Sequence, residues 1–169
     1  MDYLYRADAW QALYTAVASA TAALTGLLFI AFSLNLHTIV KVPMHRARAR
    51  EIFGMTLSLL VLSVLMLIPE QDHRVLGSEL IAGSLVLALV AGRFQLRMFR
   101  HLAPALRYRW ALRLALVHLG TLSLVIAGIS LVIEQFGGLF WLVPTILIYM
   151  LWSLTNAWLL VVQASEERS

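Results

Sequence analysis

The sequence predicts an all-α integral membrane protein, a bundle of five transmembrane helices. Hydrophobic residues make up 61% of the 169 positions and charged residues only 13%. The mean hydropathy of +0.83 is too high for a soluble globular domain. The apolar residues also gather in five segments separated by short polar stretches. We therefore expect a single membrane domain over residues 1–169.

The first segment, residues 12–36, contains no charged residue. At about 1.5 Å per residue it exceeds the ~30 Å hydrocarbon core of a bilayer. Small residues recur along it at alternating steps of three and four, so they share one helix face that suits close packing. We expect the downstream helices to close around this face, the first small-residue stripe, which comprises Ala16, Ser19, Ala23, Gly26 and Ser33 together with Ile30.

The second segment, residues 52–68, follows a basic loop over residues 37–51 and stops at Pro69. The third segment, residues 76–93, holds only 13 uncharged residues between Glu79 and Arg93. It therefore spans the bilayer only if these two charged side chains reach the interfaces. A re-entrant hairpin is the alternative. It would place the later arginines on the side opposite the first basic loop, so the pattern favours a span.

Residues 114–133 form the expected fourth helix and residues 139–162 the fifth, joined by a tight turn that holds Gly137 and Gly138. The third helix is expected to continue past the membrane, because its arginines step by four and three until Pro104 breaks the helix. The fourth helix carries a second small-residue stripe, which comprises Gly120, Ser123 and Ala127.

The distribution of lysine and arginine predicts the orientation. Eleven of the 13 lie in the stretches 37–51 and 93–113 and in the C-terminal tail, which share one side if all five segments span. Positive charge concentrates on the cytoplasmic side of membrane proteins. We therefore expect a multi-pass plasma-membrane protein with its N-terminus outside and its C-terminus in the cytoplasm.

Three polar residues, Asn35, His118 and Asn156, are expected at similar depth near the cytoplasmic boundary. One interpretation is a polar intramembrane layer that lines a pocket or a proton-accessible path. The other is interhelical hydrogen bonding that holds the bundle together. The residue types favour the second, and both stay open.

Arginines separated by aromatic residues fill the stretch from 93 to 113. This composition is typical of a surface that meets anionic lipid headgroups or a cytoplasmic partner, although membrane orientation alone also explains it. We call it the arginine surface, and its members are Arg93, Arg97, Arg100, Arg107, Arg109 and Arg113.

Several function classes are not expected. The five histidines show no metal-ligand spacing and there is no cysteine, so we expect no metal and no cofactor. Nucleophile motifs, phosphate loops and paired carboxylates are absent from the sequence, which argues against an enzyme. The basic residues lie beside apolar segments rather than in a basic domain, so no nucleic-acid partner is expected.

Two runs carry a resemblance to a known family. TGLLFIAFSLNL at residues 25–36 and GGLFWLVPTILIYMLWSLTNAWLLVV at residues 137–162 resemble small bacterial multi-spanning membrane proteins labelled as modulators of the FtsH protease. The likeness covers nearly the whole chain in order and hydropathy. Its distinctive parts are the SLNL end of the first helix and the element Asn156–Trp158. The resemblance implies a protein of the bacterial inner membrane and carries over no functional residue.

We therefore expect a small accessory or regulatory membrane protein that forms a homo-oligomer in the lipid bilayer. It would act through helix contacts and basic-loop contacts, with a membrane protease and anionic lipids as candidate partners. The alternative is an oligomeric channel or transporter for ions or small solutes, lined by the polar layer.

Overall fold

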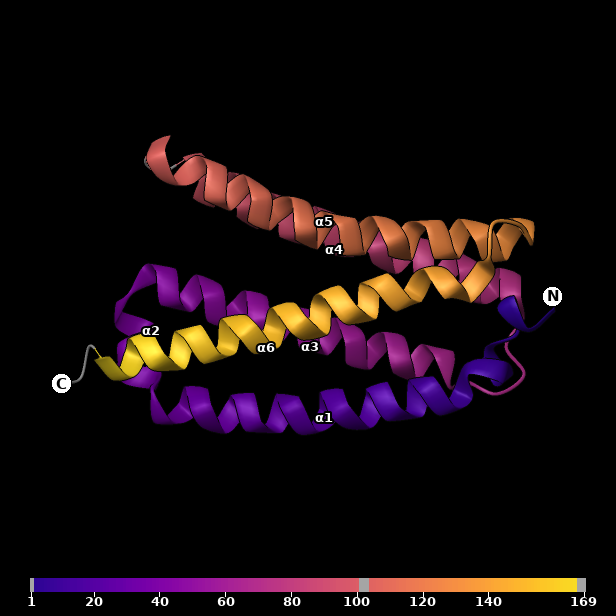
Figure 1. The fold of residues 1–169 in the computed structure, drawn as a ribbon, viewed down its shortest axis with the longest axis horizontal. Helices are drawn as coiled ribbons and strands as arrows, with labels where there is room; N and C mark the ends of the chain where they lie inside the picture. The colour runs from indigo at the N-terminus through magenta and orange to yellow at the C-terminus, as the bar shows by residue number, and fades with distance from the viewer. Residues whose placement is uncertain (1, 101–103, 167–169) are drawn as a thin grey trace. The chain divides into compact units, whose positions relative to one another are not determined.

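The structure, a computed structural model, describes residues 2–100 and 104–166 (Figure 1). Five helical stretches in these residues are long and apolar enough to cross a membrane, in agreement with the sequence. This pattern identifies an all-helical, multi-pass membrane protein. The elements are η1 (Asp2–Leu4), η2 (Ala7–Trp10), α1 (Gln11–Leu34), α2 (Leu36–Lys41), α3 (Pro43–Met66), α4 (His73–Arg100), α5 (Pro104–Ile133), η3 (Gly138–Trp141) and α6 (Leu142–Glu166).

The chain divides into two compact units. Unit 1 comprises Met1–Trp10 and Ile68–Ile148, and so contains η1, η2, α4, α5, η3 and the first turns of α6. Unit 2 comprises Gln11–Leu67 and Tyr149–Ser169, and so contains α1, α2, α3 and the remainder of α6. The single membrane domain over residues 1–169 stays a prediction.

The basic stretch 37–51, expected as a loop, is helical instead. Helix α2 covers its first residues, and α3 begins at Pro43 rather than near Ile52. Proline is well tolerated at the first helical position, and the alanines and arginines that follow are good helix formers. The loop prediction was wrong because low hydropathy marks the end of an apolar segment and not the end of a helix.

Helix α4 is one continuous helix from His73 to Arg100, which confirms both a helix through the third segment and its extension by arginine-bearing turns. Its apolar span ends at Arg93. The helix stops before Pro104, where α5 begins. At 1.5 Å per residue α4 is about 42 Å long, which exceeds the hydrocarbon core by about 12 Å.

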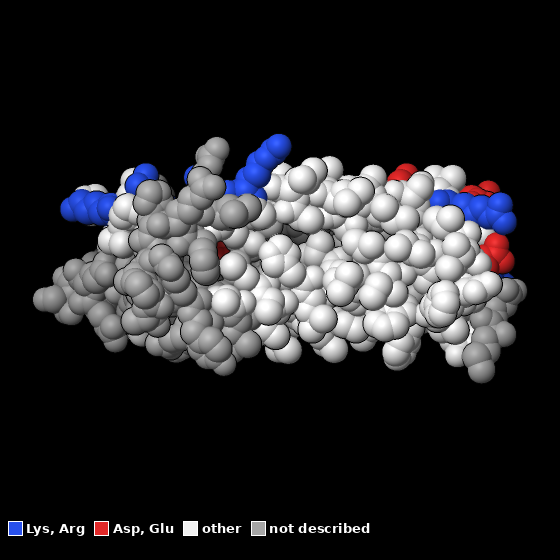
Figure 2. Space-filling view, turned by 90° about the horizontal axis from the view of Figure 1, so that it is seen from above, with Lys and Arg blue, Asp and Glu red and all other residues white. Residues whose placement is uncertain are grey.

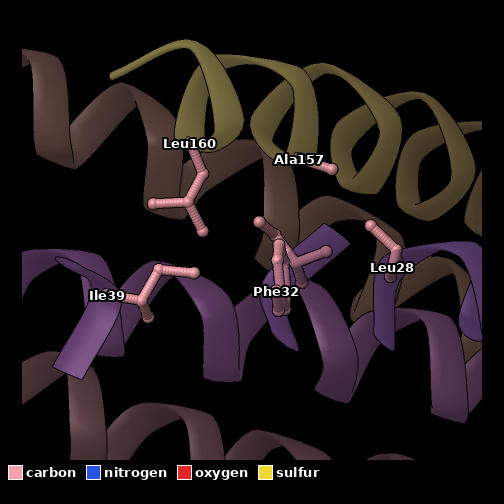
Figure 3. Close-up of a cluster of buried hydrophobic side chains, with 6 residues drawn as sticks. Leu28, Phe32, Ile39, Ala157 and Leu160 are labelled. Carbon is pink, nitrogen blue, oxygen red and sulfur yellow. The ribbon is translucent and has the colours of Figure 1, made fainter. Parts of the chain in front are cut away.

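Unit 2 is held by apolar packing between α1 and α3, with α2 and α6 contributing to the same core. The rings of Phe32 and Phe53 meet edge to face, with centroids 5.3 Å apart. Figure 3 shows side chains of α1, α2 and α6 converging on this region. We call the buried set the Phe32 cluster, and its members are Leu28, Phe32, Ile39, Ile52, Ala157 and Leu160.

The first small-residue stripe does not face the core. All of its members are exposed, and a Cβ added to Gly26 would meet no atom within 4 Å. The buried face of α1 is the neighbouring one, which carries Tyr14, Val17, Thr21, Leu28 and Phe32. Within unit 2 the other helices pack on that face and not on the stripe, because bulky side chains make more van der Waals contacts than small ones. The wider expectation that all downstream helices close around the stripe stays a prediction.

The second small-residue stripe lies inside unit 1, as a packing surface should. Ala127 is fully buried on α5, and Gly120 and Ser123 are buried on the same helix. The carbonyl of Gly120 accepts a hydrogen bond from the Thr145 hydroxyl at 2.8 Å. The Ser123 hydroxyl donates to the carbonyl of Trp141. These bonds fix η3 and the start of α6 against α5.

Helices α4 and α5 form an antiparallel pair that meets at two glycines. A Cβ added to Gly77 would lie 2.7 Å from the carbonyl oxygen of Gly128. A Cβ added to Gly128 would lie 2.8 Å from the carbonyl oxygen of Gly77 and equally close to Ile81. Because the two backbones touch here, neither position accommodates a larger residue.

The turn between α5 and η3 binds the N-terminal segment. Gly137 has a φ of 92°, which favours glycine, and its N–H donates to the Tyr5 hydroxyl at 3.4 Å. The Gly138 N–H donates to Ser130 Oγ at 2.7 Å. The rings of Trp10 and Phe140 meet edge to face, with centroids 6.4 Å apart. The expected tight turn is therefore confirmed, and it anchors the beginning of the chain.

The glycine contact predicts which substitutions destabilise the fold. Gly128→Ala should lower the free energy of unfolding by about 1–3 kcal/mol, because the new methyl group meets backbone that cannot move alone. Gly83→Ala on the facing helix α4 is the matched control, since a Cβ there meets nothing within 4 Å. Thermal unfolding in one detergent measures both. Equal melting temperatures for the two variants would contradict the close contact.

Candidate functional site

Two members of the predicted polar layer, Asn35 and Asn156, lie in unit 2 and are buried. Asn35 stands at the junction of α1 and α2, where its Nδ2 donates to the Ala31 carbonyl at 2.9 Å. Asn156 is in α6, where its Nδ2 donates to the Trp152 carbonyl at 2.8 Å. Each amide thus bonds to the backbone of its own chain segment, four residues earlier.

The third member, His118, lies in unit 1 on α5 and is exposed. Its Nε2 donates to Gln95 Oε1 on α4 at 2.8 Å. His118 therefore links two neighbouring helices of unit 1. None of the hydrogen bonds given above runs between two of the three residues Asn35, His118 and Asn156. The partner Gln95 could have been found from the sequence only by knowing how α4 and α5 align.

The space beside the two asparagines is apolar. The Phe32 cluster supplies buried side chains from four helices of unit 2, and its members are at most 6% exposed. Phe32 lies one helical turn before Asn35 and Ala157 follows Asn156 directly. Packed apolar side chains therefore lie near both asparagines in unit 2.

Two polar contacts join α3 to α6 in unit 2, and both use α3 residues from the basic stretch 37–51. Arg48 Nη1 donates to Gln163 Oε1 at 2.7 Å, and the Arg48 side chain is half-buried. About one turn further along α3, Glu51 Oε1 accepts a hydrogen bond from Trp152 Nε1 of α6 at 3.4 Å. The sequence analysis missed both contacts, because their partners lie more than 100 positions apart in the chain.

The arginine surface occupies the ends of α4 and α5 beyond their apolar spans. Arg93 is exposed at the end of the α4 span. The backbone of α4 carries Arg97 and Arg100, and that of α5 carries the other three. The side chains of these five fall outside the described residues. Figure 2 shows in colour the charged side chains that the structure describes, with Lys and Arg in blue and Asp and Glu in red.

A charged cluster that the sequence analysis missed joins α4 to the end of α5. His73 Nε2 lies 2.9 Å from Glu134 Oε1, and Arg74 Nη2 lies 3.6 Å from the same oxygen. Glu134 has a φ of 55°, in the left-handed region typical of a residue just past a helix C-terminus. The cluster lies at the opposite ends of α4 and α5 from the arginine surface and closes the helix pair there.

No metal-binding group is found in the part of the chain that the structure describes, since nowhere in it do three or more His, Cys, Asp or Glu side chains gather suitably. Comparison of the chain with models of protein families, with curated proteins and with solved structures finds no match.

Asp72, the residue before the first turn of α4, generates a prediction on pH. Its Oδ1 accepts hydrogen bonds from the backbone N–H of Arg74 at 2.7 Å and of Val75 at 3.4 Å. The Arg74 N–H is the main reason that the pKa of Asp72 is lowered below its usual value. The ionised carboxylate therefore stabilises the fold above about pH 4, and this contribution disappears as the pH falls through the lowered pKa.

Asp72→Ala should accordingly melt at a lower temperature than the wild type at pH 7. The difference between the two proteins should shrink as the pH is lowered below about 4. Thermal unfolding at a series of pH values measures this difference. A constant difference at every pH would show that Asp72 acts through some feature other than its charge.

Proposed function

We propose that the chain is a small accessory or regulatory protein of the bacterial inner membrane that works by contact rather than by catalysis. The observation that carries this proposal is the extension of α4 and α5 beyond their apolar spans. The extending residues 94–100 and 104–113 carry arginines and no acid. Two helices of this kind, projecting from a membrane, offer a surface for a partner or for anionic lipid.

The proposal includes an orientation with the N-terminus outside and the C-terminus in the cytoplasm. The concentration of lysine and arginine in 37–51, 93–113 and the tail supports it. The five apolar helices support it as well, because an odd number of spans puts the two termini on opposite sides. The arginine surface then faces the cytoplasm.

Reporter fusions test the orientation. A reporter fused after Arg74 should give a periplasmic signal, and one fused after Ser169 a cytoplasmic signal, because three spans separate the two points. A fusion after Arg50 serves as a cytoplasmic control from the first basic stretch. Periplasmic and cytoplasmic signals in the reverse order, or both fusions on one side, would refute the orientation.

On the basis of the sequence resemblance, we propose a membrane protease as the partner. We also propose that the chain acts as a homo-oligomer. The arginine surface would supply the cytoplasmic contact and the exposed first small-residue stripe a helix contact. The apolar Phe32 cluster supports this role over transport, because it places packed apolar side chains near Asn35 and Asn156. The accessory role also needs no catalytic group.

The alternative, an oligomeric channel or transporter, has one observation in its favour. The hydroxyls of Tyr14 and Ser153 are buried without a hydrogen-bond partner in the part of the chain that the structure describes. Unpartnered hydroxyls at membrane depth are costly and accept water readily. A channel would have to bring such groups onto one path.

Two variants distinguish these functions. Replacing Arg93, Arg97 and Arg100 by Gln together should weaken capture of the protease or of anionic lipid in a detergent pull-down, with a strong salt dependence. His118→Leu should leave capture unchanged. The mass of the captured complex reports the oligomeric state and the partner together.

The control for the triple variant is Arg6→Gln with Arg74→Gln, which removes two positive charges at the other end of the spans. Flux in proteoliposomes is measured in parallel. Robust flux through the wild type that His118→Leu abolishes would overturn the accessory role and establish the alternative.

A further inference from the structure

Helix α2 has apolar side chains on two sides, although it is only six residues long. Ile39 points into unit 2 and is 4% exposed. Leu36 and Val40 lie one turn apart on another side and are 56% and 50% exposed. Helix α2 follows directly on the end of the α1 span and precedes the α3 span. Exposed apolar side chains at such a position are available to lipid acyl chains.

Basic residues follow this apolar face in the chain. Lys41 ends α2 and Arg46 lies in the first turn of α3, and both are exposed. Neither forms an ion pair in the part of the chain that the structure describes. Residues 36–50 contain no acid at all. Arg48, by contrast, turns toward Gln163 of α6 and is half-buried.

The positive charge at the start of α3 does not stabilise that helix. Arg46 occupies the first turn of α3, where the helix dipole favours negative charge and no acid is present. An anion at this position would offset this effect.

We propose that the α2–α3 corner, defined by Leu36, Val40, Lys41 and Arg46, is a binding surface for an anionic phospholipid. The acyl chain lies against Leu36 and Val40, and Lys41 and Arg46 bind the headgroup phosphate. The combination of exposed apolar and unpaired basic side chains at the end of two spans selects a lipid, because a soluble anion would gain nothing from the apolar pair. The proposal does not depend on the accessory role.

Native mass spectrometry of the purified full chain tests the corner, with phosphatidylglycerol and phosphatidylcholine as competing probes. The wild type should retain phosphatidylglycerol preferentially. Lys41→Gln with Arg46→Gln should reduce this preference about tenfold. Arg6→Gln with Arg74→Gln is the charge-matched control at the other end of the spans, and it should keep the preference. Leu36→Ser with Val40→Ser should reduce retention of both lipids.

A second measurement uses only the wild type, so it does not depend on any variant folding. Phosphatidylglycerol with a photoreactive headgroup should label peptides within residues 36–50, and added salt should reduce the labelling. Labelling confined to other peptides would overturn the proposal. So would an equal loss of preference in the control variant, or displacement of the lipid by soluble glycerol phosphate at the same concentration.

Discussion

The contact of backbone with backbone at Gly77 and Gly128 determines how unit 1 is built. Lipid tails are as apolar as leucine, so burying apolar side chains gives membrane helices little reason to associate. Close packing of the main chains provides that reason, and it requires that no Cβ intervene. Once α4 and α5 touch at this level, the His73–Glu134 contact can close one end of the helix pair. The bond from His118 to Gln95 lies further along the same two helices.

Unit 2 is held together by a different kind of packing. Its contacts are made by large side chains, above all those of the Phe32 cluster. Three of its buried hydroxyls do not disturb this packing, because each bonds to the backbone of its own helix. Thr21, Thr56 and Ser63 each donate to the carbonyl four residues earlier, at 2.7, 2.9 and 2.8 Å. A hydroxyl satisfied in this way behaves toward neighbouring helices almost as an apolar group.

Hydropathy predicted the five membrane-length helices, because a bilayer requires each spanning segment to satisfy its own backbone. It could not predict where helices end, and so the basic stretch 37–51 was assigned to a loop. Residue spacing showed which side chains share a face but not which face is buried. The stripes of α1 and α5 have the same pattern, yet Gly26 is exposed and Ala127 is fully buried. Gly77 and Gly128 belong to no repeated pattern, and only the three-dimensional alignment of α4 with α5 pairs them.

The predicted polar layer depended on the assumption that a polar residue at membrane depth needs a partner on another helix. Asn35 shows one way in which that assumption fails, since its amide N–H bonds to a carbonyl four residues earlier in its own segment. Depth in the membrane is thus a weak guide to function for an asparagine. A charged residue is a stronger guide, because no backbone carbonyl neutralises a guanidinium.

The proposed function therefore rests mainly on the arginines. Membrane orientation requires only that positive charges lie close to the ends of the spans on one side. It does not require that the helix itself continue past its apolar span, as the backbone of α4 does from Arg93 to Arg100. A helical backbone fixes the spacing of the residues along it, which suits recognition of a partner or of anionic lipid. The proposed contact function therefore rests on this placement of the arginines and not on their number.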